Sequence, residues 1–171
     1  MSSRDKFLNG GAYCRTVFQA INKTALAAGT GDATEVDCAW VDRMLDNVGM
    51  ALSAKLVITY TAALETGETL SFAGNFQDAS ALAGTGAADY STAFAAAVVA
   101  TGDSGGSTET GTYEVDVDLA GAREFIRAQI TPNLSRGATD TCEWSASLVL
   151  FGDHRQPSTQ ATYSLGNANS I

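Results

Sequence analysis

The stretch that decides the fold is residues 113–151, YEVDVDLAGAREFIRAQITPNLSRGATDTCEWSASLVLF. It holds three runs in which apolar and polar residues alternate, separated by turn-forming residues. The apolar members of the three runs are Tyr113, Val115, Val117 and Leu119, then Ile126, Ala128 and Ile130, then Trp144, Ala146, Leu148 and Leu150. A period of two places one face of a strand in a core and the other in water. The stretch therefore predicts three strands of a half-buried sheet, and it contains few of the residue types that perform chemistry.

Similar runs extend through the upstream chain. Further strands are predicted at 13–21, 35–41, 51–61, 69–77 and 89–100, with turns or loops at 26–34, 65–68 and 79–88 and a flexible hairpin tip at 101–111. Runs 51–61 and 69–77 are joined by a short turn around Gly67, and we expect them to form an antiparallel pair. The segment 40–49 fits either a short helix or an irregular turn. With about seven to nine strands and at most one short helix, the sequence predicts an all-β fold, either an antiparallel β-sandwich, a barrel or a jelly roll.

The chain length of 171 residues corresponds to one domain. We expect a β domain over 13–152, a flexible N-terminal arm over 1–12 and a flexible C-terminal tail over 153–171. No stretch approaches the roughly 20 apolar residues that a membrane span requires, so no membrane contact is expected. The N-terminal residues lack the layout of a secretory signal, which makes export unexpected.

The net charge of −9 bounds the choice of partner. An acidic protein repels the phosphate backbone, so no nucleic acid partner is expected. The three cysteines, Cys14, Cys38 and Cys142, form no CxxC motif and are odd in number. They are expected to be small buried side chains in a reducing compartment, and whether any of them links subunits by a disulfide stays open.

Three groups of residues are candidates for chemistry. His154 is the single histidine and follows the last strand, with no G-x-S-x-G motif to supply a nucleophile. Glu114, Asp116 and Asp118 share one strand face, where carboxylates about 6–7 Å apart could act in glycoside hydrolysis or bind a cation. The glycine-rich segments 29–35 and 102–106 lack the lysine and the following helix of a phosphate loop. We interpret these groups as exposed or turn residues, and we expect no enzyme, no catalytic residue, no metal and no cofactor.

A carbohydrate-binding β-sandwich is an alternative that requires exposed aromatic side chains. Trp40 and Trp144 fall on the apolar side of their runs and are predicted to lie in the core. The pattern does not decide the positions of Tyr13, Tyr113 and Tyr163.

A family resemblance enters with residues 116–157, DVDLAGAREFIRAQITPNLSRGATDTCEWSASLVLFGDHRQP. This segment resembles the C-terminal part of small structural proteins encoded beside the major capsid gene in tailed bacteriophages. Residues 24–43, TALAAGTGDATEVDCAWVDR, and 51–72, ALSAKLVITYTAALETGETLSF, are similar to the same group. The resemblance implies a capsid cement, or decoration, protein with a jelly-roll fold.

The resemblance also implies where such a protein acts. A decoration protein would be a homo-dimer or homo-trimer on the outside of an icosahedral shell, assembled in the host cytoplasm, with the major capsid protein as its partner. The family has no catalytic residues to carry over. A carbohydrate-binding domain on the virion surface, a hydrolase that uses Asp116, and a tail or neck component remain the competing hypotheses.

Overall fold

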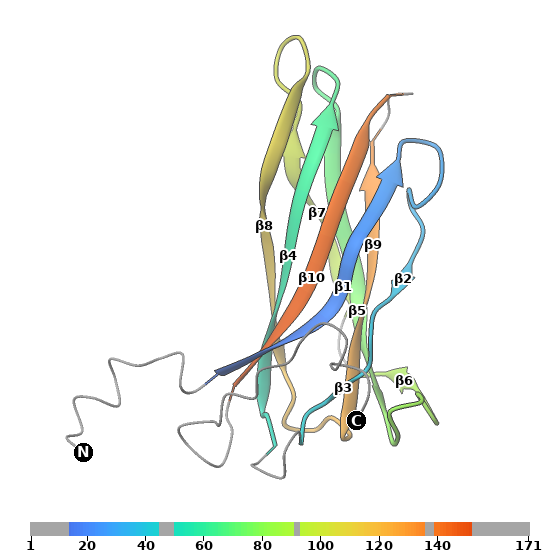
Figure 1. Ribbon diagram of the computed structural model, residues 1–171, viewed down its shortest axis with the longest axis vertical. Helices are drawn as coiled ribbons and strands as arrows, with labels where there is room; N and C mark the ends of the chain where they lie inside the picture. The colour runs from blue at the N-terminus through green and yellow to red at the C-terminus, as the bar shows by residue number, and fades with distance from the viewer. Residues whose placement is uncertain (1–13, 45–49, 91–92, 136–138, 152–171) are drawn as a thin grey trace, which may run out of the picture.

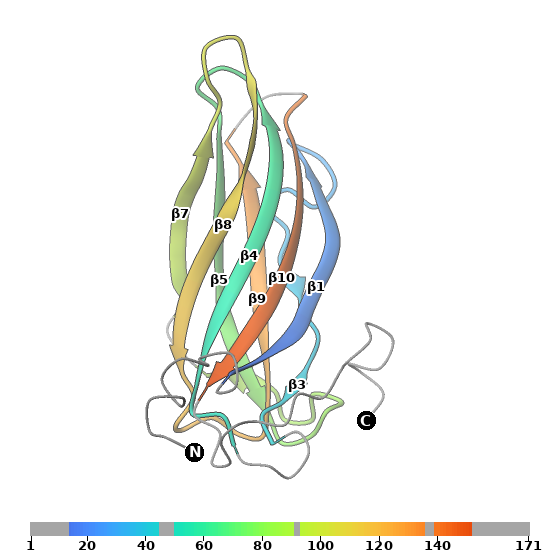
Figure 2. The same cartoon turned by 60° about the vertical axis from the view of Figure 1, so that its left-hand side comes forward.

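A computed structural model describes residues 14–44, 50–90, 93–135 and 139–151, and all the regular structure in them is β. Two antiparallel sheets face each other as a sandwich (Figures 1 and 2). The strands are β1 (Cys14–Leu26), β2 (Val36–Asp37), β3 (Val41–Asp42), β4 (Ser53–Leu64), β5 (Thr69–Ala79), β6 (Ala88–Asp89), β7 (Phe94–Thr101), β8 (Ser107–Asp118), β9 (Phe125–Leu134) and β10 (Thr141–Phe151). The described residues include no helix that could span a membrane.

The order of the strands identifies the architecture. The first sheet runs β1-β10-β4-β8. The second sheet has β9 and β5 at its centre, with β2 and β3 along β9, and with β6 and β7 along β5. The strand pairs are nested inside one another along the chain, as in one long hairpin that has been rolled up. From the outermost to the innermost they are β1 with β10, β2 and β3 with β9, β4 with β8, and β5 with β7. This arrangement is a jelly roll, and it confirms the predicted fold class.

Two turns do not make the hairpins that the sequence predicts. Strands β4 and β5 flank the turn at 65–68, yet they lie in different sheets, so the expected antiparallel pair is wrong. The segment 101–111 is not a hairpin tip either, because β8 already begins at Ser107 and β7 lies in the opposite sheet. The two turns pack together: the Gly67 and Gly102 amides donate to Gly102 O and Glu68 O at 2.9 and 2.8 Å. A Cβ on Gly102 would lie 2.0 Å from the Glu65 carbonyl oxygen, so this close approach requires glycine.

The segment 40–49 contains no helix where it is described. Val41–Asp42 form β3, and the chain turns at 43–44, which agrees with the irregular-turn interpretation for those residues. The Met44 amide donates to Asp42 Oδ1 at 2.6 Å, a local side-chain bond that stabilises a turn. Residues 45–49 lie outside the described residues.

The core lies between the sheets and is built by the alternating residues. The predicted inner faces of β4, β5, β9 and β10 are buried, as shown by Leu56, Ile58, Leu70, Phe72, Ile126, Ala128, Ile130, Trp144 and Leu148. The Phe72 ring bridges the sheets, with its centroid 5.9 Å from both the Tyr60 ring and the Trp144 ring. Each fully buried large apolar side chain contributes about 1.5–3 kcal/mol relative to exposure. The core position predicted for Trp144, which is 2% exposed, is confirmed.

Candidate functional site

The acidic row predicted from the sequence lies on the outer face of β8. Lys55, on the neighbouring strand β4, places its Nζ 2.8 Å from Glu114 Oε2 and 3.2 Å from Asp116 Oδ1. The hydrogen bond to Glu114, followed by that to Asp116, raises the pKa of Lys55. Asp118 Oδ1 accepts the Ala120 amide at 2.9 Å and closes the turn after the strand. The row is therefore a solvated strand face with one lysine between two of its carboxylates, as the alternation predicts.

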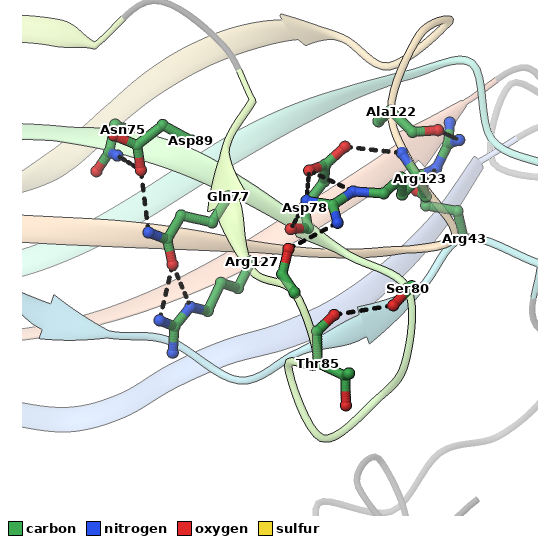
Figure 3. Close-up of polar contacts among 11 residues, drawn as sticks. Arg43, Asn75, Gln77, Asp78, Ser80, Thr85, Asp89, Ala122, Arg123 and Arg127 are labelled. Carbon is green, nitrogen blue, oxygen red and sulfur yellow. Dashed lines mark hydrogen bonds and ion pairs between the residues drawn. The ribbon is translucent and has the colours of Figure 1, made fainter.

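A polar ladder crosses the outer face of the second sheet (Figure 3). Gln77, on β5, lies directly opposite Asp89 of β6 and Arg127 of β9. The Gln77 amide donates to Asp89 Oδ1 at 3.0 Å, and its carbonyl accepts from Arg127 Nη2 at 2.7 Å. The Arg127 guanidinium continues the ladder to Asp37 Oδ2 at 3.0 Å. Donors face acceptors along this ladder, which suits a role in holding the four strands together.

Trp40 belongs to this ladder, so its predicted core position is wrong. Its ring is half-buried, and the Arg127 guanidinium carbon lies 4.7 Å above the ring centroid. A Cβ on Gly84 would lie 2.8 Å from Trp40 Nε1, which places the backbone of the 80–87 loop against the indole. The alternation at 35–41 could not reveal this contact, because Arg127 comes from a distant strand. Trp40 is covered by an arginine and a loop, so it offers no open platform for a sugar.

A salt bridge joins Asp78 of β5 to Arg123, which lies two residues before β9. Asp78 is 6% exposed, and its Oδ1 and Oδ2 accept from Arg123 Nε and from the Arg123 amide, each at 2.9 Å (Figure 3). Burial alone would raise the pKa of Asp78, but the hydrogen bonds from Arg123 outweigh it and hold the pKa below its ordinary value. Arg123 Nη1 also donates to Gly86 O at 2.7 Å, which ties the 80–87 loop to the sheet.

Arg43 is a buried cation whose described partners are mostly main-chain oxygens. It is 1% exposed and donates to the carbonyls of Arg123 and Ala51, each at 2.8 Å, and to those of Leu119 and Ala122. Burial lowers the pKa of its guanidinium. These bonds fasten the turn after β3 to the β8–β9 connection, so we assign Arg43 a structural role. The sequence gives no signal of this role, because Arg43 is a single arginine in a stretch of mixed polar and apolar residues.

One side of the sandwich is closed by a buried glutamine. Gln19 of β1 is 2% exposed; its Nε2 donates to Ala39 O and its Oε1 accepts the Ala128 amide, each at 2.8 Å. The Ala39 amide donates in turn to Gln19 O at 2.9 Å. The edge of β1 is thus joined to the segment 36–42 and to β9 of the opposite sheet. We call this edge the closed side.

The opposite side is formed by the edges of β7 and β8, and we call it the open side. Strand β8 pairs only with β4, and β7 pairs only with β5, among the residues that are described. The inner-facing Tyr113, Val115 and Phe94 remain half-buried there. A hydrogen bond from the Tyr60 hydroxyl to Val99 O, 2.6 Å long, links the sheets on this side. Figure 2 shows β7 and β8 as the neighbouring border strands of the two sheets.

The strand edges differ in regularity. Strand β8 pairs with β4 without interruption from Ser107, opposite Leu64, to Asp118, opposite Ser53. The β1–β10 ladder has irregularities at Phe18 and Ala20, and the β5–β7 ladder has two register shifts. Strands β2, β3 and β6 are two residues long. In the described part, β8 is therefore the long border strand with an unbroken ladder.

Several surface hollows in the described part of the chain contain polar groups. A wide hollow of about 710 Å³ lies at the paired turns and is lined by Glu65, Thr66, Gly106 and Asp140, among others. A second, of about 380 Å³, lies on the second sheet, where Asn75 and Asp89 adjoin Phe94 and Glu35. In the described residues, no group of three or more His, Cys, Asp and Glu side chains could hold a metal ion.

The remaining predicted residues have the following positions. Cys38 and Cys142 are buried and free, and burial raises the pKa of each thiol to about 12; Cys14 is half-buried. Segments 29–35 and 102–106 form turns, with positive φ at Gly31, Gly105 and Gly106. His154, Tyr13 and Tyr163 lie outside the described residues.

Comparison with known proteins gives distant structural similarities alone. No protein-family model matches the sequence, and no curated protein matches it. Among solved structures, the Gx strain of infectious bursal disease virus aligns with a TM-score of 0.40 at 11% identity, over 85% of this chain and 33% of that one. A mutant VP2 protein of the same virus, in derived T=1 particles, aligns with a TM-score of 0.38 at 14% identity, over 82% and 31%. The chain spans about a third of the length of these proteins, and the values are too low to place it in a family.

Proposed function

We propose that this protein is a virion structural protein and, within that class, a decoration protein that binds the outside of an icosahedral shell. The observation that carries the proposal is the open side, where the regular outer edge of β8, which has no strand partner among the described residues, borders half-buried apolar side chains. An unpaired edge is a template for another chain. The resemblance of segments between residues 24 and 157 to phage decoration proteins supports the same reading.

The physical task of a decoration protein fits this molecule. Such a protein stabilises a shell by bridging neighbouring capsomers, which raises the work needed to separate them. Several modest contacts made at once give avidity beyond that of any single contact. A symmetric homo-oligomer would present the same patch to equivalent shell sites. The segments 1–12 and 153–171 would add contacts beyond the β domain, and the net charge of −9 suits a locally basic shell surface.

The test is whether the protein is a stoichiometric part of the particle. Particles are purified from cells that express this gene with its neighbouring genes, and the copy number is measured by quantitative mass spectrometry and cryo-EM. We expect one copy or oligomer for each equivalent shell site, on the outer surface. Shells that lack the protein should break at lower temperature or lower osmotic stress, and adding the purified protein should restore them. Absence from particles, or a few copies at one vertex, would overturn the decoration role.

A truncated chain tests the contribution of the terminal segments. A variant without residues 1–12 and 153–171 should bind shells more weakly than the full chain while it melts at a similar temperature. Equal binding by both chains would show that the β domain alone makes the contact.

The hollow beside Phe94 favours carbohydrate binding as a second candidate. Asn75, Asp89 and Glu35 line this hollow with amide and carboxylate groups, which are polar groups able to hold sugar hydroxyls. A glycan array with wild type and Asp89→Asn tests it, because this change removes the charge at nearly constant size. Glycan binding that is lost in Asp89→Asn would support this function, and an array without signal would remove it.

A further inference from the structure

We propose that residues 112–118 of β8 are the docking edge for an extended, basic segment of a partner protein, which pairs with β8 as a fifth strand of the first sheet. This inference rests on the proposed function for the partner's identity as a shell protein. The docking geometry itself rests on the strand edge and its charges alone.

The main chain of β8 is suited to pairing with a further strand. A strand that joins a sheet needs a regular row of free amides and carbonyls, and bulges are a common way of preventing such additions. Strand β8 keeps one-to-one register with β4 over its whole length, so its outer edge is equally regular. The β1 edge is irregular and partly bonded to residue 39, and β7 carries register shifts. In the described part of the chain, β8 is the edge best suited to main-chain pairing.

The docking site occupies only the second half of β8. Near the start of the strand, Glu109 lies on the inner side close to Tyr60. Burial raises the pKa of the Tyr60 phenol, and the charge of Glu109 raises it further. An inward-pointing charge is a known guard against edge pairing. Below it, the inner side carries Tyr113, Val115 and Val117, of which the first two are half-buried. An added strand would cover their exposed surface, so the apolar part of the site begins at about residue 112.

The charges on the outer face of β8 favour a basic occupant. On the outer face, Glu114, Asp116 and Asp118 recur at every second residue, and the side chain of Asp116 is 81% exposed. Lys55 approaches the row from β4, which leaves the free flank without a described cation. A second copy paired through β8 would bring carboxylates opposite carboxylates, which is destabilising. A partner strand with alternating lysine or arginine and apolar residues would match both faces of the edge.

The experiment uses three short peptides and the full chain. The probe is an acetylated and amidated octapeptide of alternating lysine and valine. One control replaces each lysine by glutamate, and the other groups the same lysines and valines into two blocks. Affinity is measured by calorimetry at low salt, and amide hydrogen exchange locates the contact. We expect the alternating peptide to bind, to slow exchange within 112–118, and to bind about tenfold more tightly than the block peptide.

Variants with matched net charge distinguish binding at the β8 edge from general electrostatic attraction to an acidic protein. Glu114→Lys with Asp116→Lys should weaken binding by about tenfold or more. Asp103→Lys with Glu143→Lys makes the same change in net charge elsewhere, at exposed side chains, and should leave the affinity within about twofold. If the first double variant does not fold, Glu114→Gln with Asp116→Asn replaces it, because those changes keep the side-chain size.

Several results would overturn the inference. These are no binding, equal binding of alternating and block peptides, protection at β1 or β7 instead of 112–118, or equal losses in the two double variants. If the protein dimerises as its concentration rises, and amide exchange within 112–118 then slows without any peptide, the edge binds a second copy of the chain instead. If shells bind the wild type and the Glu114/Asp116 variant equally, the docking edge is ruled out and the decoration role is unaffected. If the peptide binds at β8 but the protein is absent from particles, the docking edge is supported and the decoration role is overturned.

Discussion

The closed side and the open side of the sandwich solve the same problem in different ways. Both must manage the borders of two sheets, where main-chain groups have no strand partner. On the closed side Gln19 bonds to Ala39 and Ala128 from a fully buried position. On the open side the Tyr60 hydroxyl donates to Val99 O, and the Tyr60 ring also contacts the Phe72 ring. The difference shows that side-chain bonds from Gln19 join the two sheets on the closed side, whereas the open side leaves the edge of β8 accessible among the described residues.

The largest effect is expected from opening the closed side. Gln19→Leu removes the side-chain bonds to Ala39 O and to the Ala128 amide, together with a longer one to Phe18 O at 3.4 Å, and leaves the buried Ala128 amide and the partly buried Ala39 carbonyl without these partners. Each such loss costs about 1–3 kcal/mol, so the free energy of unfolding should fall by about 3 kcal/mol in urea denaturation. Gln77→Leu is the matched control, because water can reach the partners of Gln77, and it should cost less than about 1 kcal/mol. Similar losses in the two variants would contradict the special role of the closed side.

A salt bridge that belongs to neither side gives the next largest effect. The folded pKa of Asp78 is lowered, so its carboxylate contributes stability above the ordinary value of 3.8, and this contribution is lost as the pH falls through the lower folded pKa. Asp78→Asn should therefore cost about 2 kcal/mol at neutral pH, and the gap to wild type should shrink below about pH 4. Urea titrations across this range measure it. A gap that is constant with pH would mean that the charge of Asp78 is not what stabilises the contact.

A smaller effect is expected at the open side. Tyr60→Phe removes the hydroxyl that bonds to Val99 O and keeps the ring in the core. We expect a loss of about 1 kcal/mol and faster hydrogen exchange in β7, with exchange in β1 unchanged. If Tyr60→Phe destabilised the protein more than Gln19→Leu, the assignment of closed and open sides would be reversed.

The smallest change in stability is expected at Lys55, which is a solvent-accessible partner of the acidic row. Lys55→Met should leave the melting temperature unchanged within error, because exposed ion pairs contribute little. The same change removes a cation that competes for Glu114 and Asp116. The alternating lysine–valine peptide should therefore bind about two- to threefold more tightly to the variant. Weaker binding would show instead that Lys55 contacts the peptide.

Within single strands, the sequence was a reliable guide. Alternation predicted which faces of β4, β8, β9 and β10 lie in the core, because burial on one face imposes a period of two whatever the neighbouring strand is. Pairing was harder to predict. The turn at 65–68 has the composition of a hairpin, but the same residues also serve a connection that crosses between sheets. Short turns report that the chain reverses, and they do not report which sheet it enters.

The contacts between distant strands were beyond the reach of the sequence. The ladder through Asp37, Gln77, Asp89 and Arg127 draws one residue from each of four strands, so no local spacing signals it. Trp40 was misplaced for the same reason. Gln19 sits in a run whose polar and apolar residues do not alternate cleanly, and nothing marks it as buried. The acidic row was visible because it lies within one strand, although its lysine partner was not.

The nesting of strand pairs has a consequence for synthesis. Strand β10 is an inner strand of the first sheet, and β1 has β10 as its strand partner in the described residues, with Cys14 opposite Phe151. The first sheet can therefore be completed only after the residues through Phe151 have left the ribosome. Of the nested pairs, the inner pair β5–β7 closes the shortest loop and should form first, with the other nested pairs added outward. Before β10 is synthesised, β1 and one edge of β4 lack their partner strand. A chain that terminates before β10 would therefore expose two long strands that can aggregate.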